Sequence, residues 1–238
     1  MKTLKSFMLL VGILLGSTVF YSCLDDDDSY SAYWNATPAI VTVKPLSDNT
    51  YYMQLDDSTT LYPTNQYFPG NLRETRAFVR YNIEDKKEAG YDHAVQLLRM
   101  DTLLTKQIAP DLGVENDAYY GTDMLALVGA SGWAKGGVWI EDGYITFDFL
   151  VNVGDRHFLN LVQANAADPY ELEFRHKAEG GNNIYDPLRG LVSFKLDKLP
   201  STEGKTVKLK IKYKSFVSND YNTVELDYKS KDTEDTEE

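Results

Sequence analysis

Apolar and polar residues alternate in short segments along most of the chain, while long helical periodicity is hard to find. A period of two places successive side chains on opposite faces of a strand, so it predicts β structure. The clearest alternating segments are residues 76–83, 144–153, 206–214 and 223–228. In the second of these, Ile145, Phe147 and Phe149 share one face, which predicts a strand with its apolar side in a core. We therefore expect an all-β fold.

The first half of the chain predicts a compact barrel. Its strands are expected at residues 39–44, 51–55, 59–62, 76–83 and 93–108, the last as one bent strand or two. Val79, Tyr81 and Ile83 should form the core face of the fourth strand. Short strands with a long loop between the third and the fourth fit a closed barrel, which we assign to residues 34–112.

The second half predicts a β-sandwich. Residues 110–120 are rich in turn-forming residues and read as a linker, after which the alternation resumes at Met124. Glu141-Asp142-Gly143 stands between two strands, and Asp-Gly in such a place is a strong hairpin signal. Seven or eight strands at this spacing fit a sandwich, which we assign to residues 116–229 and expect to fold by itself.

The N-terminal segment, residues 1–22, has the features of a secretory signal peptide. A positive start at Lys2 and Lys5 precedes an apolar run that is too short for a comfortable membrane span. Cys23, the single cysteine, follows directly, where a bacterial lipoprotein carries its diacylglycerol. Cys23 is therefore the predicted lipid-attachment site, and a free thiol after an ordinary signal peptide is the alternative. Acyl chains contribute ~0.8 kcal/mol for each buried methylene and would hold the mature chain to a bilayer.

Negative charge is concentrated near the two ends of the mature chain. The net charge is −12, and Asp25–Asp28 and the acidic segment 230–238 carry much of it. Because adjacent like charges repel, residues 23–33 are expected to be a solvated tether and 230–238 a disordered tail. A cysteine followed by an acidic run also resembles the export signal of surface lipoproteins in certain Gram-negative anaerobes, with a plain spacer as the alternative. The acidic balance argues against nucleic acid as a partner, since phosphates need a basic surface.

Several strand segments carry a family resemblance. They are Trp139–Ile145 and Leu172–His176 in the second half, Gly190–Phe194 further on, and Arg76-Ala77 and Leu104–Ile108 in the first half. With these segments the chain resembles the NigD-like lipoproteins over nearly all of its mature length. The resemblance implies an N-terminal OB-type barrel followed by an immunoglobulin-like β-sandwich. The family name comes from a bacteriocin locus, which hints at immunity, and the resemblance brings no catalytic residues.

Few residues stand out as candidates for chemistry. His93, His157 and His176 show no metal-ligand spacing, so we expect neither a metal site nor a cofactor. Trp133 and Trp139, close to several glycines, could form an aromatic platform for a sugar ring. A core position for Trp139 and a loop plug at Trp133 are the alternative.

A stripe of alternating lysines covers residues 208–214. Such a stripe could meet a polyanion such as lipopolysaccharide. A solvated strand face whose charges also prevent edge-to-edge pairing is the favoured interpretation.

Three functional hypotheses follow. The first is a non-catalytic lipoprotein of the outer membrane that faces the cell exterior or, alternatively, the periplasm. It would contact the membrane through its lipid and bind a surface glycan or a protein. The second is an immunity protein that protects its producer against a bacteriocin. The third is an enzyme that acts on cell-surface glycans, although the sequence selects no pair of carboxylates for it.

Overall fold

The computed structural model describes residues 33–47, 49–66, 72–129, 137–154, 156–180 and 183–231. The chain divides into two units between Thr37 and Pro38, and the two β domains belong to the second. Cys23, the acidic run Asp25–Asp28 and Trp133 lie outside the described residues. No helix in the described ranges is long and apolar enough to cross a membrane.

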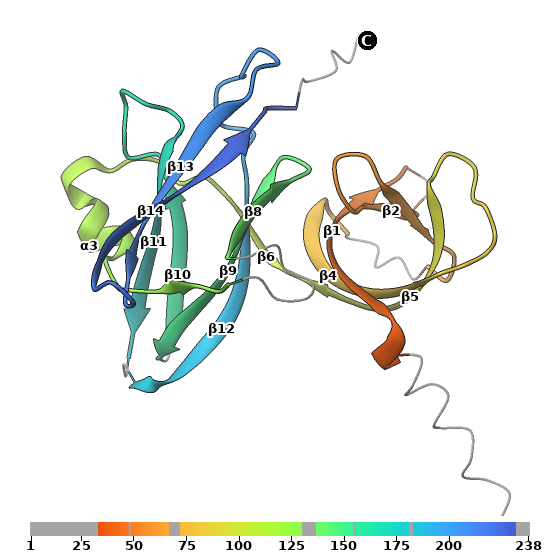
Figure 1. Cartoon of the computed structure of the whole chain (residues 1–238), viewed down its shortest axis with the longest axis horizontal. Coiled ribbons are helices and arrows are strands. Elements are labelled where there is room, and N and C mark those ends of the chain that lie inside the picture. The colour runs from red at the N-terminus through yellow and green to blue at the C-terminus, as the bar shows by residue number, and fades with distance from the viewer. Residues whose placement is uncertain are drawn as a thin grey trace, which may run out of the picture. The chain divides into compact units, whose positions relative to one another are not determined.

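The first domain is a closed barrel with the strand order β1-β2-β3-β5-β4 (Figure 1). Its strands are β1 (Thr37–Pro45), β2 (Tyr51–Gln54), β3 (Thr60–Pro63), β4 (Thr75–Ile83) and β5 (His93–Thr102). The pairing of β3 with β5 is parallel, whereas β1 with β2, β2 with β3 and β4 with β5 pair antiparallel. The predicted small barrel is thus confirmed.

The inward positions of the barrel strands are small and medium apolar residues together with two tyrosines. The core consists of Ala39, Val41, Val43, Tyr51, Met53, Leu61, Ala77, Val79, Tyr81 and Val95. Val79 and Tyr81 are buried as predicted, but Ile83 is 59% exposed, so its assignment to the core face is wrong. Ile83 is the last residue of β4. Alternation predicts the side on which a residue lies, but it does not predict where the barrel ends.

The second domain is a sandwich of two sheets. One sheet has the order β10-β11-β13-β14, and the other has the order β6-β12-β9-β7, with β8 also paired to β9. The strands are β6 (Leu104–Gln107), β7 (Ala126–Leu127), β8 (Val138–Glu141), β9 (Tyr144–Val153), β10 (Arg156–Val162), β11 (Glu171–Glu179), β12 (Asn183–Lys195), β13 (Val207–Ser215) and β14 (Asp220–Tyr228). The predicted β-sandwich is confirmed.

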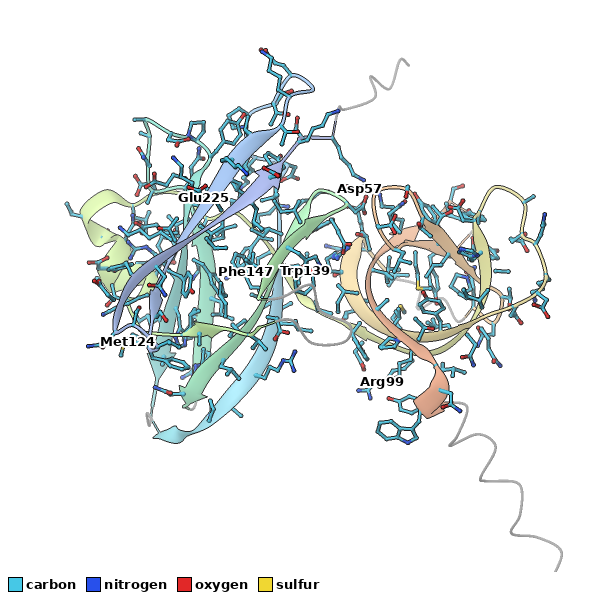
Figure 2. The ribbon with its side chains drawn as sticks, in the orientation of Figure 1. Asp57, Arg99, Met124, Trp139, Phe147 and Glu225 are labelled. Atoms are coloured by element: carbon cyan, nitrogen blue, oxygen red, sulfur yellow. The ribbon has the colours of Figure 1, made fainter. Side chains whose placement is uncertain are left out.

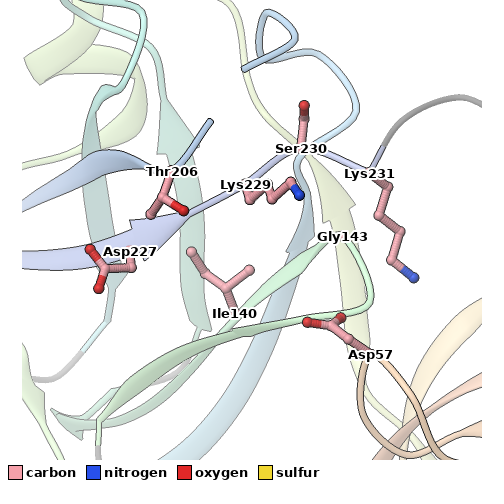
Figure 3. Close-up of a pocket in the computed structure, with 8 residues that line it drawn as sticks. All are labelled: Asp57, Ile140, Gly143, Thr206, Asp227, Lys229, Ser230 and Lys231. Atoms are coloured by element: carbon pink, nitrogen blue, oxygen red, sulfur yellow. The ribbon is translucent and has the colours of Figure 1, made fainter. Parts of the chain in front are cut away.

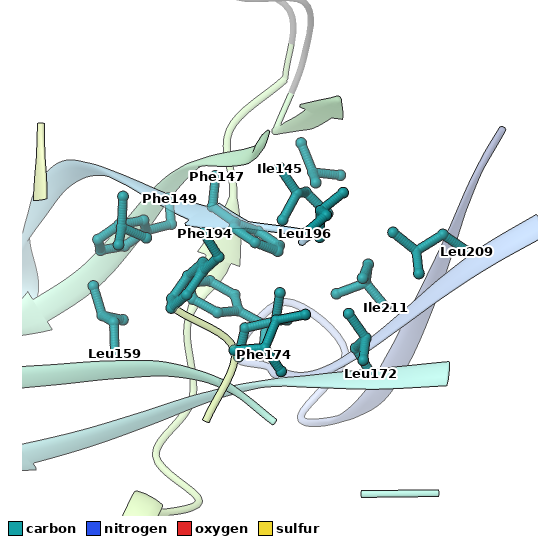
Figure 4. Close-up of a cluster of buried hydrophobic side chains, with 14 of the residues drawn as sticks. Ile145, Phe147, Phe149, Leu159, Leu172, Phe174, Phe194, Leu196, Leu209 and Ile211 are labelled. Atoms are coloured by element: carbon teal, nitrogen blue, oxygen red, sulfur yellow. The ribbon is translucent and has the colours of Figure 1, made fainter. Parts of the chain in front are cut away.

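Large apolar side chains from both sheets fill the space between them (Figure 4). The rings of Phe147 and Phe174 stack at a centroid distance of 4.0 Å, and Phe194 meets Phe147 edge to face at 5.9 Å. Ile145, Phe147 and Phe149 are at most 4% exposed, as the alternation of β9 predicts. Face-to-face sheets lie about 10 Å apart, and side chains of this size fill that layer.

Residues 93–108 form two strands that belong to different domains. β5 lies in the barrel, while β6 pairs parallel with β12 of the sandwich. The segment that the sequence predicts as a linker, residues 110–120, contains two short helices, η1 (Gly113–Glu115) and α3 (Asn116–Tyr120). The Asn116 side chain accepts from Leu112 N–H at 2.9 Å and donates to Asp111 at 2.6 Å, which fixes this turn locally.

Candidate functional site at the junction of barrel and sandwich

The junction of the two domains is organised by the hairpin between β8 and β9. Asp142 and Gly143 have φ angles of 51° and 76°, the left-handed pair that a two-residue type I′ turn requires. Asp142 N–H donates to the Asp57 carboxylate of the barrel at 3.1 Å. The predicted Asp-Gly hairpin is therefore confirmed, and its tip is also a point of contact with the barrel.

The β9 face opposite the sandwich core is buried as well. Tyr144, Thr146 and Asp148 are at most 2% exposed. Thr146 and Ser193 share a hydroxyl hydrogen bond at 2.9 Å, and Asp148 is ion-paired to Arg189. This sheet therefore has two covered faces, a polar one and an apolar one.

An apolar contact forms part of the junction. Ile40 of β1 and Trp139 of β8 are buried against each other and against the partly buried Phe78, Leu103 and Leu191. Trp139 is 5% exposed and donates its indole N–H to Glu141 at 3.1 Å. Trp139 thus lies on the barrel side of its sheet, whereas Phe147 lies in the sandwich core (Figure 2).

The burial of Trp139 argues against the predicted aromatic platform for a sugar ring at Trp133 and Trp139. A ring that is 5% exposed has no open face for a sugar, so Trp139 takes the core position that was the alternative. The partner residue Trp133 lies outside the described residues.

Buried charges lie beside this apolar contact. Arg76 of β4 is fully buried, donates to Thr42 at 3.0 Å and faces Glu141 at 3.5 Å. Burial lowers the pKa of Arg76, and the Glu141 carboxylate opposes that shift. Among the described residues, Arg76 Nε and Asp142 Oδ2 are buried without a hydrogen-bond partner.

Two lysines meet the Asp142 carboxylate at the hairpin tip. Lys44 of β1 lies 3.0 Å from it, and Lys231 from the segment after β14 also binds it. Burial acts against the charged form of Asp142, yet hydrogen bonds from Lys231, Thr42 and Lys44 hold its pKa below the usual value. Asp142 is therefore an anion that ties β1 and the C-terminal segment to the hairpin.

A second carboxylate, Glu74, performs the same task at the start of β4. Tyr144 donates its hydroxyl to Glu74 at 2.6 Å, and Lys195 donates at 3.1 Å. Burial disfavours the charged form of Glu74, but these bonds keep its pKa below the usual value. Burial and the Glu74 bond raise the pKa of Tyr144 strongly, so this phenol stays protonated.

A polar cavity of about 400 Å³ opens beside the hairpin (Figure 3). Its lining residues are Asp57, Ile140, Gly143, Thr206, Asp227, Lys229, Ser230 and Lys231. Several of these groups already have partners, because Lys231 binds Asp142, Asp227 binds Lys208 and Ser230 accepts from Thr202. The cavity can hold a small polar molecule, but its two carboxylates are engaged in structural bonds.

The histidines divide into the exposed His93 and a pair formed by the half-buried His157 and the buried His176. Nδ1 of His157 lies 2.9 Å from Nε2 of His176, and Nδ1 of His176 lies 3.2 Å from the Met124 carbonyl oxygen. Since that carbonyl can only accept, His176 carries its proton on Nδ1, and His157 donates to its Nε2. Sequence patterns do not predict this pairing, because it depends on the register of β10 and β11.

The possible metal site and the lysine stripe are the two remaining candidates from the sequence. Within the described residues, no three His, Cys, Asp or Glu side chains are grouped as metal ligands. In the lysine stripe, Lys208 pairs with Asp227, Lys210 with Asp168 and Lys212 with Glu173. These neighbouring carboxylates favour a solvated strand face over a surface for polyanions.

Both domains of the chain match models of the same protein family. Residues 40–103 match the model of a NigD-like N-terminal OB domain, and residues 107–229 match that of a NigD-like C-terminal β-sandwich domain. The chain belongs to the NigD-like family.

Among solved structures, one from Parabacteroides distasonis, described as a candidate toxin-related protein, is 35% identical. The match covers 82% of this chain and 94% of that one, with a TM-score of 0.70. A NigD-like immunity protein from Bacteroides caccae is 18% identical over 84% and 100% of the two chains, with a TM-score of 0.59. A candidate lipoprotein from Bacteroides fragilis is 16% identical over 83% and 100%, with a TM-score of 0.61. The last two show the fold alone. The comparison with curated proteins found no match.

Proposed function

We propose that this protein is a non-catalytic lipoprotein of the outer membrane that is anchored through Cys23 and binds a partner at the cell surface. The signal-like segment before Cys23 and the acidic run Asp25–Asp28 after it support the anchor and the tether. The solved structures with a similar fold include a protein described as a candidate lipoprotein, which supports the lipid anchor.

The observation that carries the non-catalytic role is how the junction uses its charged groups. Arg76 faces Glu141, Asp142 binds two lysines, and Glu74 binds Tyr144 and Lys195. A general acid or base must be able to exchange a proton with a substrate. Charges that are paired with each other across a domain boundary instead hold the barrel and the sandwich together as a binding scaffold.

The anchor is tested by replacing the cysteine. Cys23→Ser should abolish incorporation of a labelled fatty acid and either release the protein into the soluble fraction or leave its signal peptide uncleaved. Ser29→Ala, a few residues downstream, is the matched control and should be labelled and fractionated normally. Normal processing and outer-membrane fractionation of the Cys23 variant would contradict the anchor.

The orientation is tested on the tether. Replacement of Asp25–Asp28 by asparagine preserves the length and removes the charges. If the run is an export signal, protease added to intact cells should degrade the unchanged protein and spare the variant. Equal protection of both proteins would place the protein on the periplasmic side, and equal degradation would make the run a spacer.

An immunity function is the second candidate. It is favoured by the structural neighbour that is described as a NigD-like immunity protein, whose fold this chain shares. A strain that lacks the protein should then become sensitive to a bacteriocin from related strains, and expression of the intact chain should restore resistance. Unchanged sensitivity across a panel of producer strains would exclude this role.

A further inference from the structure

Three tyrosine rings meet on the outside of the barrel. Tyr62 and Tyr91 stack at a centroid distance of 4.8 Å and an angle of 29°, and Tyr52 lies 5.5 Å from Tyr91 at 40°. Successive strand residues alternate in direction, and the neighbours Tyr51, Met53 and Leu61 fill the barrel interior. The rings of Tyr52 and Tyr62 therefore point outward. All three rings are half-buried, and together they form what we call the tyrosine surface.

The segment that carries Tyr91 is held in place by reciprocal hydrogen bonds. The N–H and hydroxyl of Thr60 donate to the Asp92 carboxylate at 2.8 and 2.7 Å, and Asp92 N–H donates back to the Thr60 hydroxyl at 3.1 Å. Thr60 begins β3, the strand that also carries Tyr62. These bonds hold the residues next to Tyr62 and Tyr91 together, so a ligand that binds the outer parts of the two rings loses little conformational entropy in ordering them.

Two charged residues beside the tyrosine surface disfavour anionic ligands. Lys44 is the register partner of Tyr52, but its ammonium group is bound to Asp142. Asp92 adjoins Tyr91, and the hydrogen bonds from Thr60 hold its pKa below the usual value, so it is negative at neutral pH. A phosphate or sulfate chain would meet a carboxylate with no free ammonium at Lys44 to compensate for it.

We propose that the tyrosine surface binds a neutral oligosaccharide, whose pyranose rings stack on the exposed parts of the aromatic rings. Tyrosine brings a flat apolar ring face together with a polar hydroxyl, and a sugar ring offers the same two features. Other OB barrels accommodate oligosaccharides over strands 2 and 3, which correspond to β2 and β3. This inference deepens the proposed binding function by naming a ligand class and a surface, and it rests on that function.

The test uses the mature chain with Cys23→Ser in solution. Neutral hexasaccharides of glucose, mannose and xylose are titrated by calorimetry, and polygalacturonate, an oligothymidylate and a proline-rich dodecapeptide are titrated alongside. At least one neutral hexasaccharide should bind. Tyr62→Ala and Tyr91→Ala should each weaken its binding by about tenfold or more, as loss of a stacking ring does elsewhere. Tyr62→Phe and Tyr91→Phe keep the ring and should bind nearly as well as the unchanged chain.

Tyr221→Ala is the matched control, since Tyr221 is an exposed tyrosine on β14 of the other domain. Its affinity should not change. Thermal unfolding of each variant separates loss of the ring from loss of the fold. Thr60→Val removes the hydroxyl that holds Asp92 and should weaken binding less than Tyr91→Ala does.

Each other outcome overturns the proposal: no neutral hexasaccharide binds, only the anionic or peptide probes bind, or binding survives both alanine variants. The measurement also separates this proposal from the function on which it rests. Cleavage of the bound oligosaccharide, seen by chromatography, would refute the non-catalytic role while leaving the tyrosine dependence intact. Failure of fatty-acid labelling at Cys23 would remove the anchor without affecting the titration.

Discussion

The barrel and the sandwich solve the same packing problem with different side chains. The barrel core uses alanine, valine and methionine together with two tyrosines, whereas the sandwich core is built around three mutually packed phenylalanines. A barrel that closes with five strands has a narrow interior, in which two tyrosines pack among smaller side chains. Two facing sheets leave a thicker layer that requires large rings. The residue types at the inward positions of a strand therefore differ between the barrel and the sandwich, whereas the alternation itself is common to both.

The two domains also differ in how continuous they are along the chain. The barrel is complete at β5, but the sandwich takes its edge strand β6 from the residues that follow directly. Ile108 lies in the sandwich core, and Lys106 donates to Leu159 O and to Asn160 at 2.6 and 2.7 Å. The segment before α3 is therefore structural for the second domain, and a sandwich that begins at residue 116, as the sequence predicts, would lack it.

The largest effect should come from removing this segment. A fragment of residues 104–231 should fold cooperatively, whereas one of residues 117–231 loses β6 and the buried Ile108. The loss should cost at least about 5 kcal/mol, from one large core side chain and several hydrogen bonds. Circular dichroism and urea unfolding of the two fragments check this. Equal stabilities would show that the sandwich is complete without β6.

A single core substitution should have a larger effect in the sandwich than in the barrel. Phe147 is fully buried and stacked on Phe174, so Phe147→Ala should cost about 3–5 kcal/mol. Val79→Ala in the barrel removes fewer atoms and should cost about 2 kcal/mol. Denaturant unfolding of the full mature chain measures both. A cost below about 1 kcal/mol for Phe147→Ala would contradict the assigned core.

The junction between the domains should respond to loss of a single charge. Glu141→Gln keeps the acceptor for Trp139 and removes the nearest negative charge from the buried Arg76, which should cost about 2–3 kcal/mol. The double variant Arg76→Met, Glu141→Gln removes both charges and should recover part of that loss. A double-mutant cycle gives the coupling. A coupling near zero would mean that the 3.5 Å contact contributes nothing to holding the domains together.

Much of the fold could be predicted because strand alternation is a local property. Ile145, Phe147 and Phe149 were placed correctly, and the Asp142-Gly143 turn followed from the left-handed backbone that these residues tolerate. Ile83 was misplaced because its exposure depends on where the barrel ends.

The contacts at the junction could not be predicted, because they also depend on structure beyond the single strand. Arg76 lies on the polar side of β4, and polar residues on one face of a strand usually meet solvent. Its complete burial follows from a second domain that covers this face, and local alternation carries no information on that contact. The tyrosine surface was missed likewise, since Tyr52, Tyr62 and Tyr91 come together only through the barrel register.

The smallest expected effect is a pH dependence that the sandwich has and the barrel lacks. Burial lowers the pKa of His176, and the nearby His157 lowers it further, while the Met124 carbonyl and Asp123 oppose the shift. As the pH falls through about 6.5, the ordinary pKa of histidine, His176 takes up a proton in the unfolded chain but stays neutral in the folded chain. Stability should therefore be fully present above that pH and decline below it, before the carboxylates with lowered pKa values begin to titrate.

Unfolding of the mature chain between pH 7.5 and 5.5, about one unit on either side of that value, measures the slope. His176→Gln should flatten this slope, and His93→Gln, a change at an exposed barrel residue, should leave it unchanged. If His176→Gln kept the same slope as the unchanged chain, the buried His176 would not be its source.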